Sequence, residues 1–344
     1  MSIFNKFEQK GGRMRTLLYA NTIDFDFALQ QRPHHLMNLL SKTNKYKVYW
    51  VNQSKTNNKG KTIINDNLEV YHHWDVFVKR VPEVDIYFSS WAERYKDLDR
   101  VKAKLVLYDS LDNFEVNSYN ESDMLKHSQI VLTASKPLYE LRKSEHSNVS
   151  LCRNGCFPEL GYTNYDEPIE YKTLRQNGKP ILLFSGALAY WCDLDIVQAL
   201  TIRYNVVVVG LPWGITTKPT NCTYVGKKSY QELQAYYSHC DVNLLPFKRC
   251  QISDYSNPIK MFEGMSHGKI TVSTDIPEAC DSEYSDIVLT SSNKAEFIQN
   301  IEKALLIKDD ENIISKCYDV AKNNSWRNRI IHIDSLIKNY FEEN

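Results

Sequence analysis

The chain has 344 residues, and its 42 lysines and arginines balance its 42 aspartates and glutamates. This length predicts two domains that each bury a core, and the balanced charge excludes the strong positive field of a nucleic-acid-binding protein. No apolar run approaches the roughly 18 residues of a membrane span, and the eight cysteines, scattered without a C-x-x-C pair, indicate reduced thiols in a cytoplasmic protein rather than a disulfide framework.

The first half begins with a polar, basic stretch over residues 1–13, which is expected to be a flexible tail, and Met14 is an alternative start. Residues 16–20 are too short for the apolar part of a signal peptide. Short apolar runs then alternate with amphipathic stretches. The predicted strands are 16–21, 47–51, 84–88, 105–108 and 130–133, and the predicted helices are 33–41 and 135–144.

The second half repeats this alternation after residues 158–179, which carry prolines, glycines and charges without an apolar period and are predicted to be a linker or an irregular insertion outside the core. Its predicted strands are 181–185, 205–210, 222–225, 242–245, 270–273 and 286–289. Strands that alternate with helices predict an α/β fold with a parallel sheet in each half. We therefore expect two Rossmann-like domains, 14–157 and 180–326, whose sheets face each other across a cleft, and a terminal helix over 327–344 that could cross back to the first domain.

The segment over residues 256–274 is the most informative part of the chain. Asn257 is a good N-cap residue, and Pro258 suits the first position of a helix. The free N–H groups of the first turn, which includes Ile259, and the positive end of the helix dipole would attract an anion. Lys260 lies in the same turn, and Glu263 follows three residues later on the same side. This pattern is typical of an α/β domain that binds a nucleotide.

The pattern Pro-x-Lys-x-x-Glu, followed by Gly268-Lys269 and an apolar strand, resembles the donor-binding segment of GT-B glycosyltransferases, close to the family 4 type. Other segments are similar to parts of that family in the expected order. They are Asn154-Gly155-Cys156, residues 184–188 with Trp191 and Asp193, Val225-Gly226, residues 240–242, residues 245–247, and Trp326 with Arg329. The similarity covers nearly the whole chain from Thr16 and is closest to the group that contains the teichuronic acid biosynthesis glycosyltransferase.

The resemblance implies a hexosyltransferase that moves a sugar from a nucleoside diphosphate sugar, with UDP-sugars as the favoured donors, to a glycan or undecaprenyl-linked acceptor. It implies bacterial cell-surface polysaccharide synthesis, retention of configuration, and catalysis by protein groups without a metal or other cofactor. The donor-binding residues that it implies are Gly186, Lys248, Arg249, Asn257, Pro258, Ile259, Lys260 and Glu263. Glu263 would accept hydrogen bonds from the ribose, and Lys260 would stabilise the leaving diphosphate. A surface acid and a solvated helix lysine are the alternatives.

Two patterns limit the resemblance. Family 4 enzymes usually carry a second glutamate eight residues before the one matched to Glu263, and this chain has Tyr255 there, with Asp254 beside it. Asp254 could replace that glutamate only if the loop shifts. The Asp-x-Asp letters at 24–26 and 193–195 are discounted as a metal site because of their positions, and Asp193 is expected to open a helix, where acids are favoured.

In the first half, two polar clusters are candidates for the acceptor side. Arg32, His34 and His35 begin a helix after the first strand, and Arg32 could either meet a phosphate or pair with an acid of the fold. Neighbouring histidines on a helix point about 100° apart, which disfavours a zinc site. Asp109 and Asp112 follow an apolar strand, and one of them could act as a general base on an acceptor hydroxyl or cap the next helix.

A different class of function stays open at this stage. GT-B folds also serve sugar-nucleotide epimerases and catalytically inactive partner subunits, although Lys260 and Glu263 are both present here. A lipid-linked acceptor would also call for peripheral attachment to the inner face of the membrane through basic residues of the first half. The candidates are Lys42, Lys45, Lys47, Arg94, Lys96, Arg100, Lys102 and Lys104.

Overall fold

The computed structural model describes residues 13–20, 23–26, 30–53, 60–114 and 121–344, so the predicted tail lies outside the described residues apart from Arg13. The chain divides into two compact units, residues 1–153 with 329–344, and residues 154–328. No helix in the described ranges is long and apolar enough to cross a membrane.

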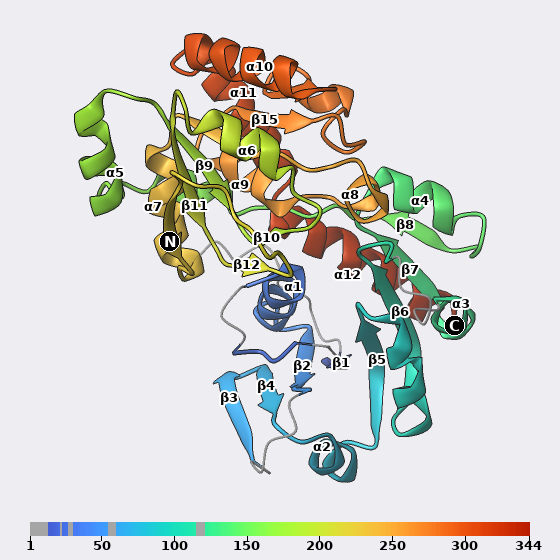
Figure 1. The fold of residues 1–344 in the computed structure, drawn as a ribbon. Coiled ribbons are helices and arrows are strands. Elements are labelled where there is room, and N and C mark those ends of the chain that lie inside the picture. Colours follow the sequence, from blue (N-terminus) through green and yellow to red (C-terminus); the bar gives the residue numbers. More distant parts are fainter. Residues whose placement is uncertain (1–12, 21–22, 27–29, 54–59, 115–120) are drawn as a thin grey trace. The chain divides into compact units, whose positions relative to one another are not determined.

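The first unit contains, in the described part of the chain, an eight-stranded sheet in the order β3-β4-β2-β1-β5-β6-β7-β8 (Figure 1). All neighbouring strands are parallel except the pair β3 and β4. The elements are β1 Arg15–Ala20, α1 Arg32–Ser41, β2 Tyr46–Val51, β3 Lys61–Asn65, β4 Leu68–Tyr71, α2 Trp74–Arg80, β5 Glu83–Ser89, η1 Ala92–Asp99, β6 Lys102–Ser110, α3 Ser122–His127, β7 Ile130–Thr133, α4 Lys136–Arg142 and β8 Val149–Leu151. The direction of the strand order reverses between β1 and β5, as in doubly wound folds.

The terminal helix α12, Trp326–Glu343, starts in the second unit and belongs to the first unit from Arg329 onward. Its Asp334 pairs with Lys45 at 2.6 Å and accepts a hydrogen bond from the Tyr46 hydroxyl at 2.7 Å. These contacts join the helix to the start of β2. The prediction that the terminal helix returns to the first domain is therefore confirmed.

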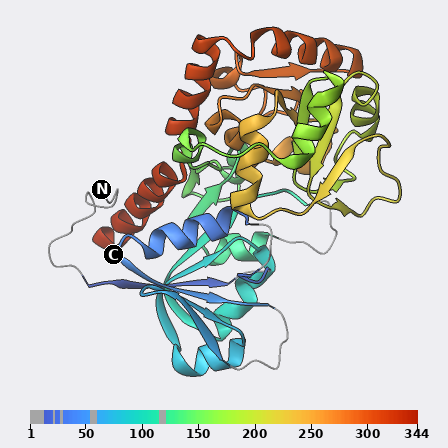
Figure 2. The same cartoon turned by 90° about the vertical axis from the view of Figure 1, so that its left-hand side faces the viewer.

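The second unit is built on a parallel sheet in the order β13-β11-β9-β14-β15-β16. Helices cover both faces of this sheet (Figure 1 and Figure 2). Its elements are η2 Pro158–Tyr162, α5 Ile169–Leu174, η3 Arg175–Asn177, β9 Ile181–Ser185, β10 Leu188–Ala189, α6 Leu194–Leu200, β11 Asn205–Val209, β12 Pro212–Trp213, β13 Thr223–Gly226, α7 Tyr230–His239, β14 Val242–Leu245, α8 Gln251–Tyr255, α9 Ile259–Ser266, β15 Thr271–Thr274, η4 Ser282–Tyr284, β16 Val288–Ser291, α10 Lys294–Ile307 and α11 Glu311–Asn323.

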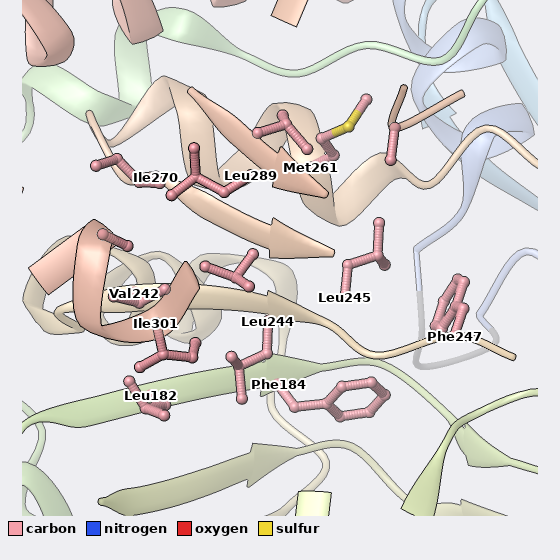
Figure 3. Packing of buried hydrophobic residues seen from close by; sticks show 14 of the residues in the cluster. Leu182, Phe184, Val242, Leu244, Leu245, Phe247, Met261, Ile270, Leu289 and Ile301 are labelled. Atoms are coloured by element: carbon pink, nitrogen blue, oxygen red, sulfur yellow. The ribbon is translucent and has the colours of Figure 1, made fainter. Parts of the chain in front are cut away.

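The alternation along β9 shows how the sequence builds this layered arrangement. Leu182 and Phe184 belong to a cluster that includes Ile301 of α10, and Figure 3 shows these three side chains. Ile181 and Leu183 point to the opposite face, where tyrosines of α5 and α7 cover them. A strand that is apolar on both faces needs helices on both sides, and the continuous apolar run of β9 meets that need.

The predicted linker over 158–179 is wrong as a description of this segment. It contains η2 and α5, and Tyr171 of α5 is fully buried against α7. The segment has few apolar residues because a single aromatic side chain anchors it. The second unit also begins at Asn154, before the predicted boundary after residue 157, because Asn154 bonds to residues of that unit.

Candidate functional site

The switch point of the second sheet lies between β9 and β14, where the direction of the strand order reverses. Doubly wound folds bind ligands at the carboxyl ends of the strands at this point. Gly186 follows β9 with a φ of +105°, and its N–H donates to Val209 O at 2.8 Å. Gly210 follows β11, and a Cβ there would come within 1.9 Å of Gly186 O. The two glycines therefore let two loops touch at the strand ends.

Lys260 of α9 reaches this glycine contact. A Cβ on Gly186 would lie 2.9 Å from Lys260 Nζ. The ammonium lies 4.7 Å from the ring centroid of Phe184 and 4.9 Å from that of Phe247, two of the residues labelled in Figure 3. Burial lowers the pKa of Lys260, and the charge of Glu263 acts in the opposite direction. Among the described residues Lys260 has no ion pair, so its charge is available to an anionic ligand.

The start of α9 differs by one residue from the prediction. Pro258 is the N-cap and the helix begins at Ile259, so Pro258 does not occupy the first helical position. Asn257 does not cap the helix, because its side chain serves tertiary contacts. Its Oδ1 accepts from the Asn154 N–H at 2.9 Å, and its Nδ2 donates to Glu278 at 2.6 Å. The N–H groups of Ile259 and Lys260 still lie in the first turn, where a helix leaves donors without internal acceptors.

The position of α9 on the sheet is fixed by Asn243 of β14. Its Nδ2 donates to Lys260 O at 3.0 Å and to Thr271 Oγ1 at 2.9 Å. Gly264 allows this approach, since a Cβ there would lie 2.7 Å from Asn243 Nδ2. The backbone that carries Lys260 is thus held by the core of the sheet.

Glu263, one turn after Lys260, is 6% exposed. It accepts a hydrogen bond from the Tyr237 hydroxyl at 3.0 Å, and the phenol of Tyr230 lies near its carboxyl. Burial raises the pKa of Glu263, whereas both phenols and the charge of Lys260 lower it. The interpretation of Glu263 as a surface acid is therefore wrong. Tyr230 and Tyr237 were not predicted, although their seven-residue spacing places them on one side of a helix.

The other two predicted donor cations differ from each other. Lys248 is exposed and has no ion pair among the described residues, and its charge, like that of Lys260, lowers the pKa of the Cys192 thiol, which burial raises. Both lysines thus lie near Cys192. Arg249 instead pairs with Asp254 at 2.6 Å. A phosphate at Arg249 would have to compete with Asp254, and the same pair occupies the carboxylate that was considered a substitute for the missing glutamate.

In the first unit, Arg32 and Asp109 form a buried ion pair. Arg32 Nε and Nη2 each lie 2.9 Å from an Asp109 carboxylate oxygen, and Nη1 donates to Arg153 O at 3.0 Å. Arg32 is 2% exposed and Asp109 is fully buried. Of the two roles considered for Arg32, the structure therefore shows the pairing with an acid. The same pairing leaves Asp109 poorly placed to act as a base.

Asp112 lies three residues beyond Asp109 and is only partly buried. Burial raises the pKa of Asp112 to about 6, and the charge of Asp109 adds to the shift. A carboxylate with a pKa near 6 exchanges protons readily close to neutral pH, as a general base must. Of the two predicted acids, Asp112 therefore has the properties that proton transfer requires.

His34 and His35 lie in the interior of the first unit and are each 4% exposed. The His34 Nδ1 accepts from the Gln31 N–H at 3.0 Å, which completes the start of α1, and its ring lies 4.9 Å from that of Trp50. Burial lowers the pKa of His34, and burial together with the nearby His34 lowers the pKa of His35 to about 3. Both are neutral parts of the core, which argues against direct contact with an acceptor.

No cluster of metal-ligating side chains occurs within the described ranges. Asp193 of the second Asp-x-Asp sequence accepts hydrogen bonds from the N–H groups of Asp195 and Ile196, each at 3.1 Å. It is the N-cap of α6, as predicted. In the first such sequence, Asp24 accepts from the Gln53 N–H at 2.7 Å. In each sequence the first aspartate thus accepts hydrogen bonds from backbone N–H groups.

Residues 180–306, which carry β9 to most of α10, match the family model described as Glycosyl transferases group 1. The segment is similar to this glycosyltransferase family, and this similarity supports a transferase enzyme. The prediction of a glycosyltransferase is therefore confirmed. The closer grouping with the teichuronic acid enzyme stays a prediction, and no curated protein matches the chain significantly.

Solved structures of similar fold cover nearly the whole chain. Sucrose-phosphate synthase from Thermosynechococcus elongatus aligns with 96% of this chain and 100% of its own, at a TM-score of 0.70 and 12% identity. A glycosyltransferase from Rickettsia africae covers 97% and 100%, with a TM-score of 0.66 and 12% identity. HepE of Anabaena, in a complex with UDP, covers 95% and 100%, with a TM-score of 0.65 and 12% identity. At such identities the likeness concerns the fold, and it confirms the predicted GT-B architecture.

Proposed function

We propose that the protein transfers a sugar from a nucleoside diphosphate sugar, with UDP-sugars as the favoured donors, to a glycan or lipid-linked acceptor. The observation that carries the proposal is the Lys260 ammonium, which lies at the switch point and against Gly186 and forms no ion pair within the described part of the chain. A diphosphate is the anion that such a cation, the first turn of α9 and the exposed Lys248 suit together. HepE of Anabaena, which has the same fold, was solved with UDP and with UDP-glucose.

In this mechanism Lys260 stabilises the charge that develops on the diphosphate as the glycosidic bond breaks. The aromatic rings beside the ammonium keep water away and strengthen its interaction with that charge. Glu263, about one turn further along the same helix, would accept hydrogen bonds from the ribose hydroxyls. Transfer without a metal ion and with retention of configuration is part of the proposal and rests on the family 4 resemblance.

On the acceptor side, we assign Asp112 to the orientation or deprotonation of the acceptor hydroxyl. Asp109 is excluded from that role by its bidentate pair with Arg32. The raised pKa of Asp112 supports the assignment, since its carboxylate takes up a proton near neutral pH more readily than an ordinary aspartate.

The cellular role that we propose is bacterial cell-surface polysaccharide synthesis on an undecaprenyl-linked acceptor at the inner face of the membrane. The basic residues considered for membrane attachment are largely neutralised. Five of them, namely Lys45, Lys47, Arg94, Arg100 and Lys104, form ion pairs with carboxylates. Any attachment through this set would be weak and salt-sensitive. Flotation with anionic liposomes at low and high salt tests it, and binding that is indifferent to salt would contradict it.

The central test of the proposed function is to incubate the purified protein with a panel of nucleoside diphosphate sugars. We expect one of them to bind and to be hydrolysed slowly, with release of the nucleoside diphosphate, and Lys260→Ala should lower the rate of release by about 10²–10³. Interconversion of two nucleotide sugars would instead indicate an epimerase. Binding without any turnover, even with glycan acceptors, would indicate a non-catalytic partner subunit.

A further inference from the structure

Two phenols from one helix enclose the carboxylate of Glu263. Tyr237 donates to Glu263 Oε2 at 3.0 Å, and the Tyr230 phenol lies close enough to the same carboxyl to lower its pKa. The two tyrosines are seven residues apart on α7, which is two helical turns, so they lie on the same side. Tyr237 is fully buried. One helix thus places both phenols beside one buried acid.

The hydrogen bonds around Tyr237 have a defined direction. Ser185 Oγ lies 2.5 Å from the Tyr237 hydroxyl. A phenol has a single proton, so when Tyr237 donates to Glu263, the Ser185 hydroxyl must donate to Tyr237. Ser185 ends β9, so the chain of hydrogen bonds runs from the sheet to the acid and ends on an acceptor.

The Tyr237 ring also packs against a neighbouring aromatic side chain. It stacks on His267 with a centroid distance of 5.9 Å and an interplanar angle of 11°, and His267 Nε2 lies 2.9 Å from Gln234 Oε1. Burial lowers the pKa of His267 to about 3, so this ring is neutral near physiological pH. The groups that face Glu263 are therefore two phenols and the cation of Lys260.

This arrangement gives the acid a specific binding capacity. An ionised carboxylate has about four lone-pair sites, and the bond from Tyr237 uses one of them, beside the Tyr230 phenol. The remaining sites match two further donors that are close together. The vicinal 2′- and 3′-hydroxyls of a ribose supply two such donors, whereas a 2′-deoxyribose supplies one.

We propose that Tyr230 and Tyr237 are positioning residues that hold Glu263 as an oriented acceptor for both ribose hydroxyls, and that they thereby set a preference for ribonucleotides over 2′-deoxyribonucleotides. This inference rests on the proposed function, in which Glu263 binds the ribose of the donor.

The test is calorimetric titration of the full-length protein with UDP and with 2′-deoxy-UDP. The wild type should bind UDP about 10-fold more tightly, the effect of one hydrogen bond to a charged group. Tyr237→Phe should lose most of this preference through weaker UDP binding. Tyr236→Phe is the matched control, because Tyr236 lies on the same helix and donates to Glu170 at 3.1 Å. It should keep the full preference.

The pH dependence of UDP affinity separates positioning from a general loss of structure. Protonation of Glu263 removes an acceptor, so affinity should fall as pH is lowered through the Glu263 pKa. Loss of a phenol donor raises that pKa further, and the midpoint should move to higher pH in Tyr237→Phe and in Tyr230→Phe but not in Tyr236→Phe. A purely structural defect would lower the affinity equally at every pH.

The outcomes are distinguishable. If folded Tyr237→Phe and Tyr230→Phe both keep the wild-type preference and pH midpoint, the inference is overturned while the proposed function stands. If the wild type binds UDP and 2′-deoxy-UDP equally, the role of Glu263 toward the ribose is overturned. If the folded wild type binds neither nucleotide, the proposed function fails and this inference fails with it.

Discussion

The two units differ in whether the cation at the start of a central helix is bonded to a carboxylate. In the first unit, the Arg32 guanidinium is buried and bonded to Asp109 and to Arg153 O. In the second unit, Lys260 lies beside two aromatic rings, and no carboxylate of the described residues is bonded to it. Each cation lies in the first turn of a helix that starts at the carboxyl ends of the strands of a parallel sheet.

The difference separates a structural charge from a functional one. A buried charge that is fully bonded contributes its interactions to the fold, and removing its partner is costly. A charge that the fold holds in an apolar site without a partner keeps its interaction for a ligand. On this argument the first pair stabilises the protein, and we propose that Lys260 binds and stabilises the diphosphate.

The largest expected effect concerns stability in the first unit. Asp109→Ala leaves the Arg32 guanidinium buried without its carboxylate, and the free energy of unfolding should fall by about 3–5 kcal/mol. Urea denaturation measures this change. Asp99→Ala, at an exposed position of the same unit, is the control and should stay within about 0.5 kcal/mol of the wild type. A loss below about 1 kcal/mol for Asp109→Ala would show that the pair does not hold the fold.

The corresponding substitution in the second unit should affect catalysis instead. Lys260→Ala should lower turnover at saturating donor by about 10²–10³, because the cation acts mainly on charge that develops in the transition state. Steady-state kinetics measure the effect, and urea denaturation should show a much smaller loss of stability than for Asp109→Ala. Near-normal turnover would mean that the diphosphate is stabilised elsewhere, and Lys248→Ala would then be the next variant to test.

The next effect concerns the ribose. Glu263→Ala should weaken binding of the nucleoside diphosphate by about 1–3 kcal/mol, the range for hydrogen bonds to a charged group. Calorimetry gives the affinity, and circular dichroism confirms the fold. Glu93→Ala, at an exposed site in the first unit, should leave the affinity unchanged. Equal affinity for Glu263→Ala and the wild type would remove Glu263 from the donor site.

A smaller effect is expected from the pH dependence of Asp112. Its folded pKa of about 6 lies above the ordinary value of 3.8, so the neutral form is favoured by folding and stability is lost as pH rises through 6. Asp112→Asn should therefore stabilise the protein more at pH 8 than at pH 5. If the carboxylate is the base, wild-type turnover should fall about tenfold per pH unit below 6. Turnover that is flat between pH 5 and 7 would contradict this assignment.

Chelation should have no effect. In the proposed mechanism Lys260 and the first turn of α9 take the place of a metal cation at the diphosphate, so the rate should be the same in excess EDTA as in magnesium. A rate that is abolished by EDTA and restored by magnesium or manganese would show that protein charges alone do not stabilise the leaving group.

The sequence allowed the local part of this site to be predicted. The Pro-x-Lys-x-x-Glu spacing identified Lys260 and Glu263 because both lie on one short helix before a buried strand. The cap assignment of Asn257 was wrong because its side chain bonds to Asn154, 103 residues away. Cap propensity is a local preference, and a tertiary partner overrides it.

The prediction of ion pairs in the first unit was limited for the same reason, because the partners lie far apart in the sequence. Arg32 and Asp109 are 77 residues apart, and no periodic pattern links them. The sequence therefore left open whether Arg32 met a phosphate or an acid. Strands β3, β4 and β8 were also missed. β3 is mostly exposed and β8 has only three residues, so neither carries the apolar run that predicts a buried strand.

The most direct test of the account compares UDP with uridine as ligands of the wild type and Lys260→Ala. Uridine lacks the diphosphate and keeps the ribose, so the two ligands separate the role of Lys260 from that of Glu263. Calorimetry should show that Lys260→Ala weakens UDP binding by about tenfold, as expected for one charged contact, and leaves uridine binding unchanged. Equal losses for the two ligands, or no loss for UDP, would contradict the claim that Lys260 is held without a partner in order to receive the diphosphate.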